Sequence, residues 1–204
     1  MIYYMRENYC IDNDRLYASG FNIGGGFVDN LACSAPEDDY FAAFAMVSPT
    51  LYTNPLCPEN KKPRCKPSRP HPILESEHAL LNLMTTLLTS TVHGADDEAN
   101  CCEGGETKGE AGLMPYYPGP DFLKRWAKRD GCNKAPDTCT KYGGLVETTS
   151  YTCQGMEGFV QGIKVGGQKH GWSSTEDNKG GKVAAVDASK KIIEFFKGHC
   201  KGHA

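Results

Sequence analysis

The chain has 204 residues, which suits one domain with a single core and excludes a large multidomain enzyme. Its 22 basic side chains nearly balance 25 acidic ones, so the formal charge of −3 gives no electrostatic reason to expect nucleic acid or an anionic membrane as a partner. Mean hydropathy is −0.49, and no apolar run approaches the roughly 18 residues of a membrane-spanning helix. An uncharged or small partner is therefore expected.

In the first part of the chain we predict a helix, a strand, a second helix and a second strand. Residues 1–9 carry apolar side chains at helical spacing, and residues 15–21 have the pattern of a short buried strand. After three glycines, the residues from 27 onward fit a helix, and residues 43–49 fit another strand. This alternation is typical of a parallel sheet with crossover helices.

The middle of the chain is irregular in composition. Prolines and basic residues in 53–72 predict a surface loop, and residues 72–75 are predicted to form the next strand. Segment 76–92 has helical propensity and an apolar face, so we predict a helix there. Residues 100–119 are rich in Gly, Glu, Cys and Pro and are predicted to be a loop.

The last part of the chain is predicted to contain two helices and two strands. The first helix begins at Pro120 and ends at Gly131, and β-branched residues predict strands at 148–153 and 159–165. The final helix spans 185–198 and is expected to turn these side chains toward the core: Val186, Ile192, Ile193, Phe195 and Phe196.

Ten cysteines favour an oxidising compartment, because this number is high for a reducing cytosol. We therefore expect an extracellular, disulfide-containing protein. Cys57 with Cys65, which flank the proline-rich loop, or Cys132 with Cys153 are the candidate bridges. The opening residues MIYYMRENYC lack the basic and apolar segments of a signal peptide, so we expect that the natural start lies upstream.

The segment YASGFNIGGG has the spacing of a nucleophile elbow, Gly-x-Ser-x-Gly, between a strand and a helix. Gly20 and Gly24 lie two residues on either side of position 22, and we expect a side chain at either glycine to clash. Position 22 is Asn, which tolerates the positive φ of such a turn but lacks the hydroxyl that forms an acyl-enzyme. Glycine-rich turns of this kind also bind phosphate, but GxGxxG and GKS/T are both absent, which disfavours that alternative.

Further sequence blocks extend the pattern beyond the elbow. In order they are ENYCIDNDRLYASGFNIGGGFVDNLAC, DDYFAAFAMVSPTLY, PILE, HGADDE, FLKRWAKRDGC, YTCQG, GQKHGWSSTE and a terminal IIEFFK. Together they resemble the secreted fungal-type feruloyl esterases, relatives of poly(3-hydroxybutyrate) depolymerases and acetylxylan esterases in the α/β-hydrolase superfamily. The resemblance implies one incomplete α/β-hydrolase domain over 1–204: a mostly parallel sheet with flanking helices, whose first strands are missing.

Segment 76–92 lies outside the resemblance, because it separates PILE from HGADDE where the family is continuous. We predict that it is an insertion. It would fit a retained intron or a mispredicted exon boundary, and a genuine lid is the competing interpretation.

The resemblance implies a Ser, Asp, His triad in that chain order. The serine position falls on Asn22, the acid on Asp97 in HGADD, with Asp96 as a near alternative, and the base on His170 in GQKHGW. In such a triad the histidine takes the proton of the nucleophile, and the carboxylate fixes the histidine tautomer. The alternative is that Asp97 and His170 are ordinary loop residues.

Three further features of the site are expected. The backbone N–H of Ile23 would supply one oxyanion donor, while the second donor would come from a loop that this chain lacks. Trp172, beside the candidate base, is expected to contact substrate. We expect no metal and no other cofactor, because the histidines and cysteine of residues 199–203 have the character of a frayed tail.

The function implied by the resemblance is carboxylic ester hydrolysis, in which a serine attacks the ester that joins ferulic acid to arabinose on xylan. Loss of the nucleophile costs roughly a millionfold, so we expect this chain to be inactive or impaired. The alternative is a non-catalytic homologue that binds cell-wall carbohydrate or phenolic esters. The expected partners are feruloylated xylan or small phenolic esters, without nucleic acid or membrane, and the expected state is a monomer.

Overall fold

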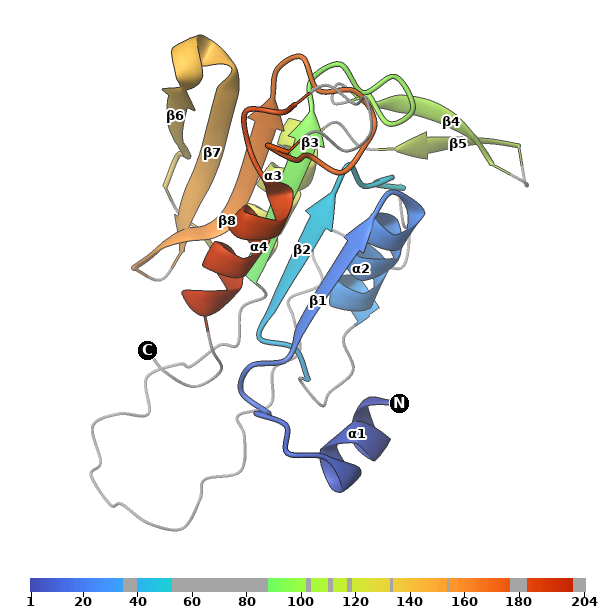
Figure 1. Cartoon of the computed structure of the whole chain (residues 1–204), viewed down its shortest axis with the longest axis vertical. Coiled ribbons are helices and arrows are strands. Elements are labelled where there is room, and N and C mark those ends of the chain that lie inside the picture. Colours follow the sequence, from blue (N-terminus) through green and yellow to red (C-terminus); the bar gives the residue numbers. More distant parts are fainter. Residues whose placement is uncertain are drawn as a thin grey trace.

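The computed structural model describes residues 1–34, 40–52, 88–101, 104–109, 112–116, 119–132, 134–153, 155–176 and 183–199. Helices and strands follow one another along the chain as shown in Figure 1. Their bounds are α1 (Ile2–Asn8), β1 (Tyr17–Phe21), α2 (Ile23–Ser34), β2 (Ala43–Val47), β3 (Leu88–Gly94), β4 (Gly105–Gly109), β5 (Gly112–Tyr116), α3 (Gly119–Arg129), β6 (Asp137–Lys141), the 3₁₀ turn η1 (Tyr142–Gly144), β7 (Val146–Cys153), β8 (Met156–Val165) and α4 (Ala188–Lys197).

The main sheet has six strands in the order β1-β2-β3-β8-β7-β6. Strands β1, β2, β3 and β8 are parallel neighbours, whereas β7 and β6 add to β8 as antiparallel strands. The predicted class, an α/β fold with a mostly parallel sheet and flanking helices, is confirmed. Because the four parallel strands run the same way, their carboxyl ends meet at one edge of the sheet, where ligands bind in open α/β folds.

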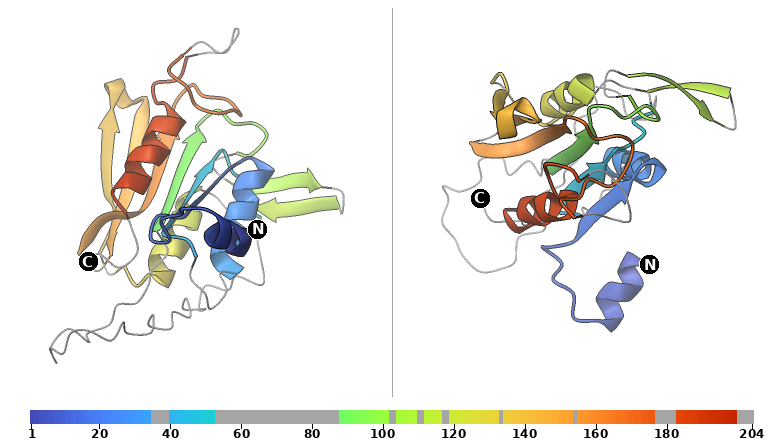
Figure 2. Two further views of the ribbon diagram at one scale, coloured as in Figure 1. Left: turned by 60° about the horizontal axis from the view of Figure 1, so that its bottom comes forward. Right: turned by 45° about the horizontal axis from the view of Figure 1, so that its top comes forward.

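Helices cover both faces of the sheet. Figures 1 and 2 show α4 on one face and α3 on the other. Helix α2 lies beside α3, to which it is joined by a hydrogen bond from Trp126 Nε1 to Asp29 Oδ1 of 3.2 Å. Strand β2, which lies between β1 and β3, is buried along its whole length, as expected for a parallel strand covered on both faces.

Most elements predicted from the sequence are present, but the predicted helix over 76–92 is wrong for its last five residues. Residues 88–92 belong to β3, which pairs with β2 on one side and β8 on the other. A short run of apolar and Thr residues in a fully buried strand cannot be separated from a buried helix by periodicity alone. Residues 76–87 lie outside the described part of the chain, so the predicted insertion stays a prediction. The predicted loop 53–72 and the predicted strand 72–75 also lie outside the described residues.

Two other segments also differ from the prediction. The predicted loop 100–119 contains β4 and β5, an antiparallel hairpin that Figure 1 shows extending away from the main sheet. Strand β6 was not predicted, since all five of its residues are exposed and no apolar alternation marks it.

The final helix is shorter than predicted, and one of its side chains was assigned to the wrong face. Helix α4 begins after Asp187, whose carboxylate accepts a hydrogen bond from Lys190 N at 2.9 Å as an N-cap. Ile192 and Phe196 face the core at a spacing of four residues, but Ile193 is 49% exposed, because the next residue on a helix points about 100° away.

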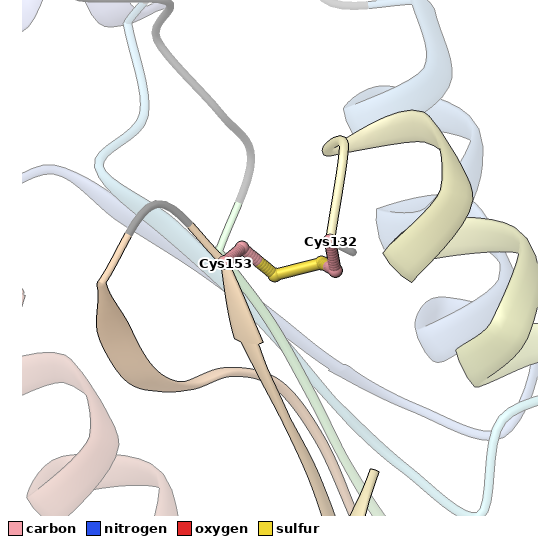
Figure 3. Close-up of a disulfide and its surroundings, with 2 residues drawn as sticks. All are labelled: Cys132 and Cys153. Carbon is pink, nitrogen blue, oxygen red and sulfur yellow. A yellow bond between two sulfur atoms is a disulfide. The ribbon is translucent and has the colours of Figure 1, made fainter. Parts of the chain in front are cut away.

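The predicted bridge between Cys132 and Cys153 is present (Figure 3) and joins the end of α3 to the end of β7. Cys33 is also disulfide-bonded. The other predicted pair, Cys57 with Cys65, lies outside the described residues. Among the described helices, none is both long and apolar enough to cross a membrane.

Candidate active site

Position 22 lies in a sharp turn between β1 and α2. Asn22 has a φ of 52°, a left-handed conformation that Asn adopts more readily than most residues. Its backbone N–H donates to Val47 O at 3.1 Å, and its carbonyl accepts from Gly26 N at 3.1 Å and Thr50 N at 3.2 Å. The turn is therefore held against the end of β2.

The glycines around the turn have different roles. A Cβ on Gly20 would lie 2.2 Å from the Gly24 carbonyl oxygen, so the strand end and the helix start are in direct backbone contact. A Cβ on Gly24 would meet nothing within 4 Å, so the expected clash at Gly24 is wrong. Helix α2 begins at Ile23 rather than after the glycines, and Gly26 is needed because its Cβ would lie 2.4 Å from Thr50 O.

The side chain of Asp97 is fully buried and its carboxylate is surrounded by donors. Oδ1 accepts from the backbone N–H groups of Ala99 at 3.0 Å and Asn100 at 2.8 Å. Oδ2 lies 2.9 Å from His170 Nδ1 and 3.2 Å from His93 Nε2. Burial raises the pKa of this carboxyl, but the hydrogen bonds from His93, Asn100 and His170 outweigh burial and bring the pKa to about 2. Asp97 is therefore an anion at neutral pH.

His170 lies in the loop that follows β8, and Asp97 determines which of its tautomers is present. Because Nδ1 faces a carboxylate, Nδ1 carries the proton, and Nε2 keeps the lone pair that a general base needs. One face of the imidazole is covered by the ring of Phe21, with ring centroids 5.3 Å apart. Asp96, the near alternative for the acid, is exposed, and its backbone N–H donates to Gln168 O at 3.0 Å.

Two close contacts hold the histidine loop in place, one from the acid loop and one from the end of β2. A Cβ on Gly94 would lie 2.3 Å from Gln168 O, so the two backbones touch there. Ser48, at the end of β2, donates from its hydroxyl to Gly171 O at 3.2 Å. The position of the imidazole therefore depends on the ends of three parallel strands.

The structure brings Asp97 and His170 into direct contact and connects Asn22 to them through a third residue. Asn100 Nδ2 donates to Asn22 Oδ1 at 3.1 Å, while the backbone N–H of Asn100 donates to Asp97. The hydroxyl of Thr50 lies 3.1 Å from Asn22 Oδ1 as well.

The remaining predicted residues lie on the rim of this cluster. Ile23 is the first residue of α2, where backbone N–H groups have no partner within the helix, and the residue is 66% exposed. Trp172 is 41% exposed; its ring meets Phe21 edge to face with centroids 6.3 Å apart, and its indole N–H donates to Ser189 Oγ at 3.1 Å.

Sequence reasoning missed the roles of four polar residues: His93, Ser48, Thr50 and Asn100. His93 is the first residue of the HGADD motif that located Asp97, but no role was predicted for it, and no motif marks the other three as functional. The signal that could have found them is their position near the carboxyl ends of neighbouring parallel strands: His93 lies in β3, Ser48 and Thr50 follow β2, and Asn100 lies in the loop after β3. Among the described residues, no group of three or more potential ligand side chains could hold a metal ion.

A left-handed turn follows β1, and an Asp–His pair joins the loops that follow β3 and β8, so these three positions lie at the carboxyl edge of the parallel strands. No family model matches the chain. Over 159 residues, or 77% of its length, the chain is 27% identical to Feruloyl esterase B of Piromyces equi, and it spans 24% of that relative.

Proposed function

We propose that the chain carries the site of a feruloyl esterase-type carboxylic ester hydrolase. In this site Asn22 occupies the nucleophile position, Asp97 is the acid and His170 is the base. The observation that carries the proposal is the 2.9 Å contact between Asp97 Oδ2 and His170 Nδ1 at the same sheet edge as a left-handed residue 22. The similarity to Feruloyl esterase B supports the same class of reaction.

The chemistry follows from the groups at this edge. With a serine at position 22, His170 Nε2 would take the hydroxyl proton as the oxygen attacks an ester carbonyl, and Asp97 would stabilise the resulting imidazolium. The N–H of Ile23 would donate to the developing oxyanion. His170 would next give the hydroxyl proton to the leaving alcohol as the ester C–O bond breaks, which leaves the acyl group on the serine. Water, deprotonated by His170, would then attack the acyl carbon and release the acid and the free serine hydroxyl. Asn22 has no hydroxyl, so the chain with Asn22 is expected to be inactive or strongly impaired.

The proposed substrates are feruloylated xylan or small phenolic esters. Two aromatic rings, Phe21 and Trp172, lie beside the base and are partly exposed at 36% and 41%, so they are suited to contact a phenolic ring. We further propose an extracellular monomer, since the disulfide between Cys132 and Cys153 is suited to an oxidising compartment.

A second candidate function is binding without hydrolysis. Asn22 is not an isolated substitution in an otherwise unchanged site, because its carboxamide oxygen lies within hydrogen-bond distance of both Thr50 and Asn100. A polar cluster built around a carboxamide favours a homologue that keeps the site and binds phenolic esters or cell-wall carbohydrate.

Release of ferulate from methyl ferulate separates the two functions. We expect no release by the chain with Asn22, slow release by Asn22→Ser, and no release when His170→Ala is added to Asn22→Ser. Release by the unmodified chain would contradict the assignment of position 22. Release by Asn22→Ser that survives His170→Ala would contradict the assignment of the base.

A further inference from the structure

Asn100 is hydrogen-bonded to the acid, to the second imidazole and to the side chain at position 22. It is only 3% exposed, and it is bonded to the loops that follow three parallel strands. Its backbone N–H donates to Asp97 Oδ1 at 2.8 Å, and its carbonyl accepts from His93 Nε2 at 2.6 Å. The main chain of Asn100 therefore holds both Asp97 and His93, the second histidine that contacts this carboxylate.

The orientation of the Asn100 carboxamide is fixed by its neighbours. Ser48 O, a backbone carbonyl, can only accept, so the group 3.1 Å from it must be the amide nitrogen Nδ2. Oδ1 then faces the Thr50 hydroxyl at 3.0 Å. With one Nδ2 hydrogen used by Ser48, the other points at the side chain of residue 22, where Asn22 Oδ1 lies at 3.1 Å.

From this geometry we infer that Asn100 is a positioning residue for the side chain at position 22. It presents a preoriented N–H donor to whatever oxygen or sulfur is placed there. A buried N–H aimed at a nucleophile stabilises the anionic form of that nucleophile and orients its remaining proton or lone pair toward the base. The inference rests on the proposed function, because it takes position 22 as the nucleophile position and His170 as its base.

A thiol at position 22 tests the inference without requiring ester turnover. In an Asn22→Cys variant, the rate of alkylation by iodoacetamide as a function of pH reports the pKa of the new thiol, because the thiolate is the reactive form. Peptide mapping by mass spectrometry follows that site separately, and Cys139, exposed on β6, is an internal reference in the same molecule. A pairing with His170 should bring the midpoint below the usual value of about 8.5.

Asn100→Asp in the Asn22→Cys background replaces the N–H donor by an oxygen and adds a carboxylate, while keeping the shape and the backbone contacts. We expect the midpoint of alkylation to rise by about one pH unit or more, which is about tenfold in the thiolate fraction below the midpoint. Asn100→Ala should also raise the midpoint of alkylation, and it adds no charge. Ser90→Ala is the matched control, because Ser90 is buried in β3 and accepts a hydrogen bond from Gln161 Nε2 at 3.2 Å, away from the site. It should leave the midpoint unchanged.

The outcomes distinguish the two proposals. An ordinary midpoint in Asn22→Cys that His170→Ala does not alter would overturn the proposed function. A lowered, His170-dependent midpoint that neither Asn100 variant shifts would overturn the inference about Asn100 alone. If Asn100→Ala does not fold, as judged by thermal unfolding, Asn100→Asp decides the question.

Discussion

His93 and His170 come from the ends of two neighbouring strands, and both place a ring nitrogen on Asp97 Oδ2, at 3.2 and 2.9 Å. The Nε2 of His93 also lies 2.6 Å from Asn100 O, so two acceptors face it and it must carry a proton. His93 therefore donates to the carboxylate that orients His170 and holds it in place.

Replacing His93 tests this support. His93→Leu removes the donor from two buried acceptors and should lower the free energy of unfolding by about 1–3 kcal/mol. His93→Gln, whose amide nitrogen can reach nearly the same place, should recover much of that loss. Urea unfolding at neutral pH measures both. Lys169→Met is the control, since the Lys169–Glu98 pair is largely exposed and should contribute little. If His93→Leu and His93→Gln lose the same free energy of unfolding, the donor role of His93 is contradicted.

Acid should destabilise the protein through Asp97. Its pKa is about 2 in the folded chain against an ordinary 3.8, so the folded state binds fewer protons and the contribution is present above pH 3.8 and lost as the pH falls toward 2. The contribution is about 2 kcal/mol. In Asp97→Asn, the free energy of unfolding should be lower at pH 5 and should fall less between pH 4 and pH 2. If the free energy of unfolding falls equally in the two proteins between pH 4 and pH 2, the expectation is contradicted.

Asp29, buried between α2 and α3, should have the opposite effect. Burial raises its pKa to about 6, despite the hydrogen bond from Trp126 and the nearby charges of Arg125 and Arg129. The folded state then holds a proton that the unfolded state has lost, so stability should decline between pH 3.8 and 6. Asp29→Asn keeps an acceptor for Trp126 and should flatten this decline, which calorimetry at pH 4, 5 and 6 measures. An unchanged slope would mean that Asp29 is ionised in the folded chain at low pH.

The two elbow glycines should respond differently to the same substitution. Gly20→Ala places a Cβ against the Gly24 carbonyl, so the turn must shift at a cost of about 3 kcal/mol or more. Gly24→Ala meets open space in the first turn of a helix and should be neutral or stabilising by up to about 1 kcal/mol. Thermal unfolding of the pair measures the difference. Similar melting temperatures would show that the backbone contact at Gly20 is not rigid.

Fold class was predictable, because the alternation of strand and helix patterns before residue 50 already specifies a parallel sheet. The pairing of Asp97 with His170 was anticipated through the resemblance, although their separation of 73 residues carries no spacing signal of its own. Asn100 could not be predicted, since its role depends on three loops meeting at one sheet edge. Strand β3, which precedes the loop that carries Asn100, was predicted to be helical over 88–92. Its residues are buried on both faces and so show no alternation.

The shared hydrogen bonds of Asn22 also bear on how this position could change over evolutionary time. A serine there is shorter than the carboxamide, so Asn100 Nδ2 and the Thr50 hydroxyl would have to shift toward residue 22 to bond its oxygen. Whether a serine is tolerated at residue 22 therefore depends on which side chains are present at positions 50 and 100. Such dependence is epistasis. Whether an ancestral reaction can be regained then depends in part on the order in which the three positions mutate.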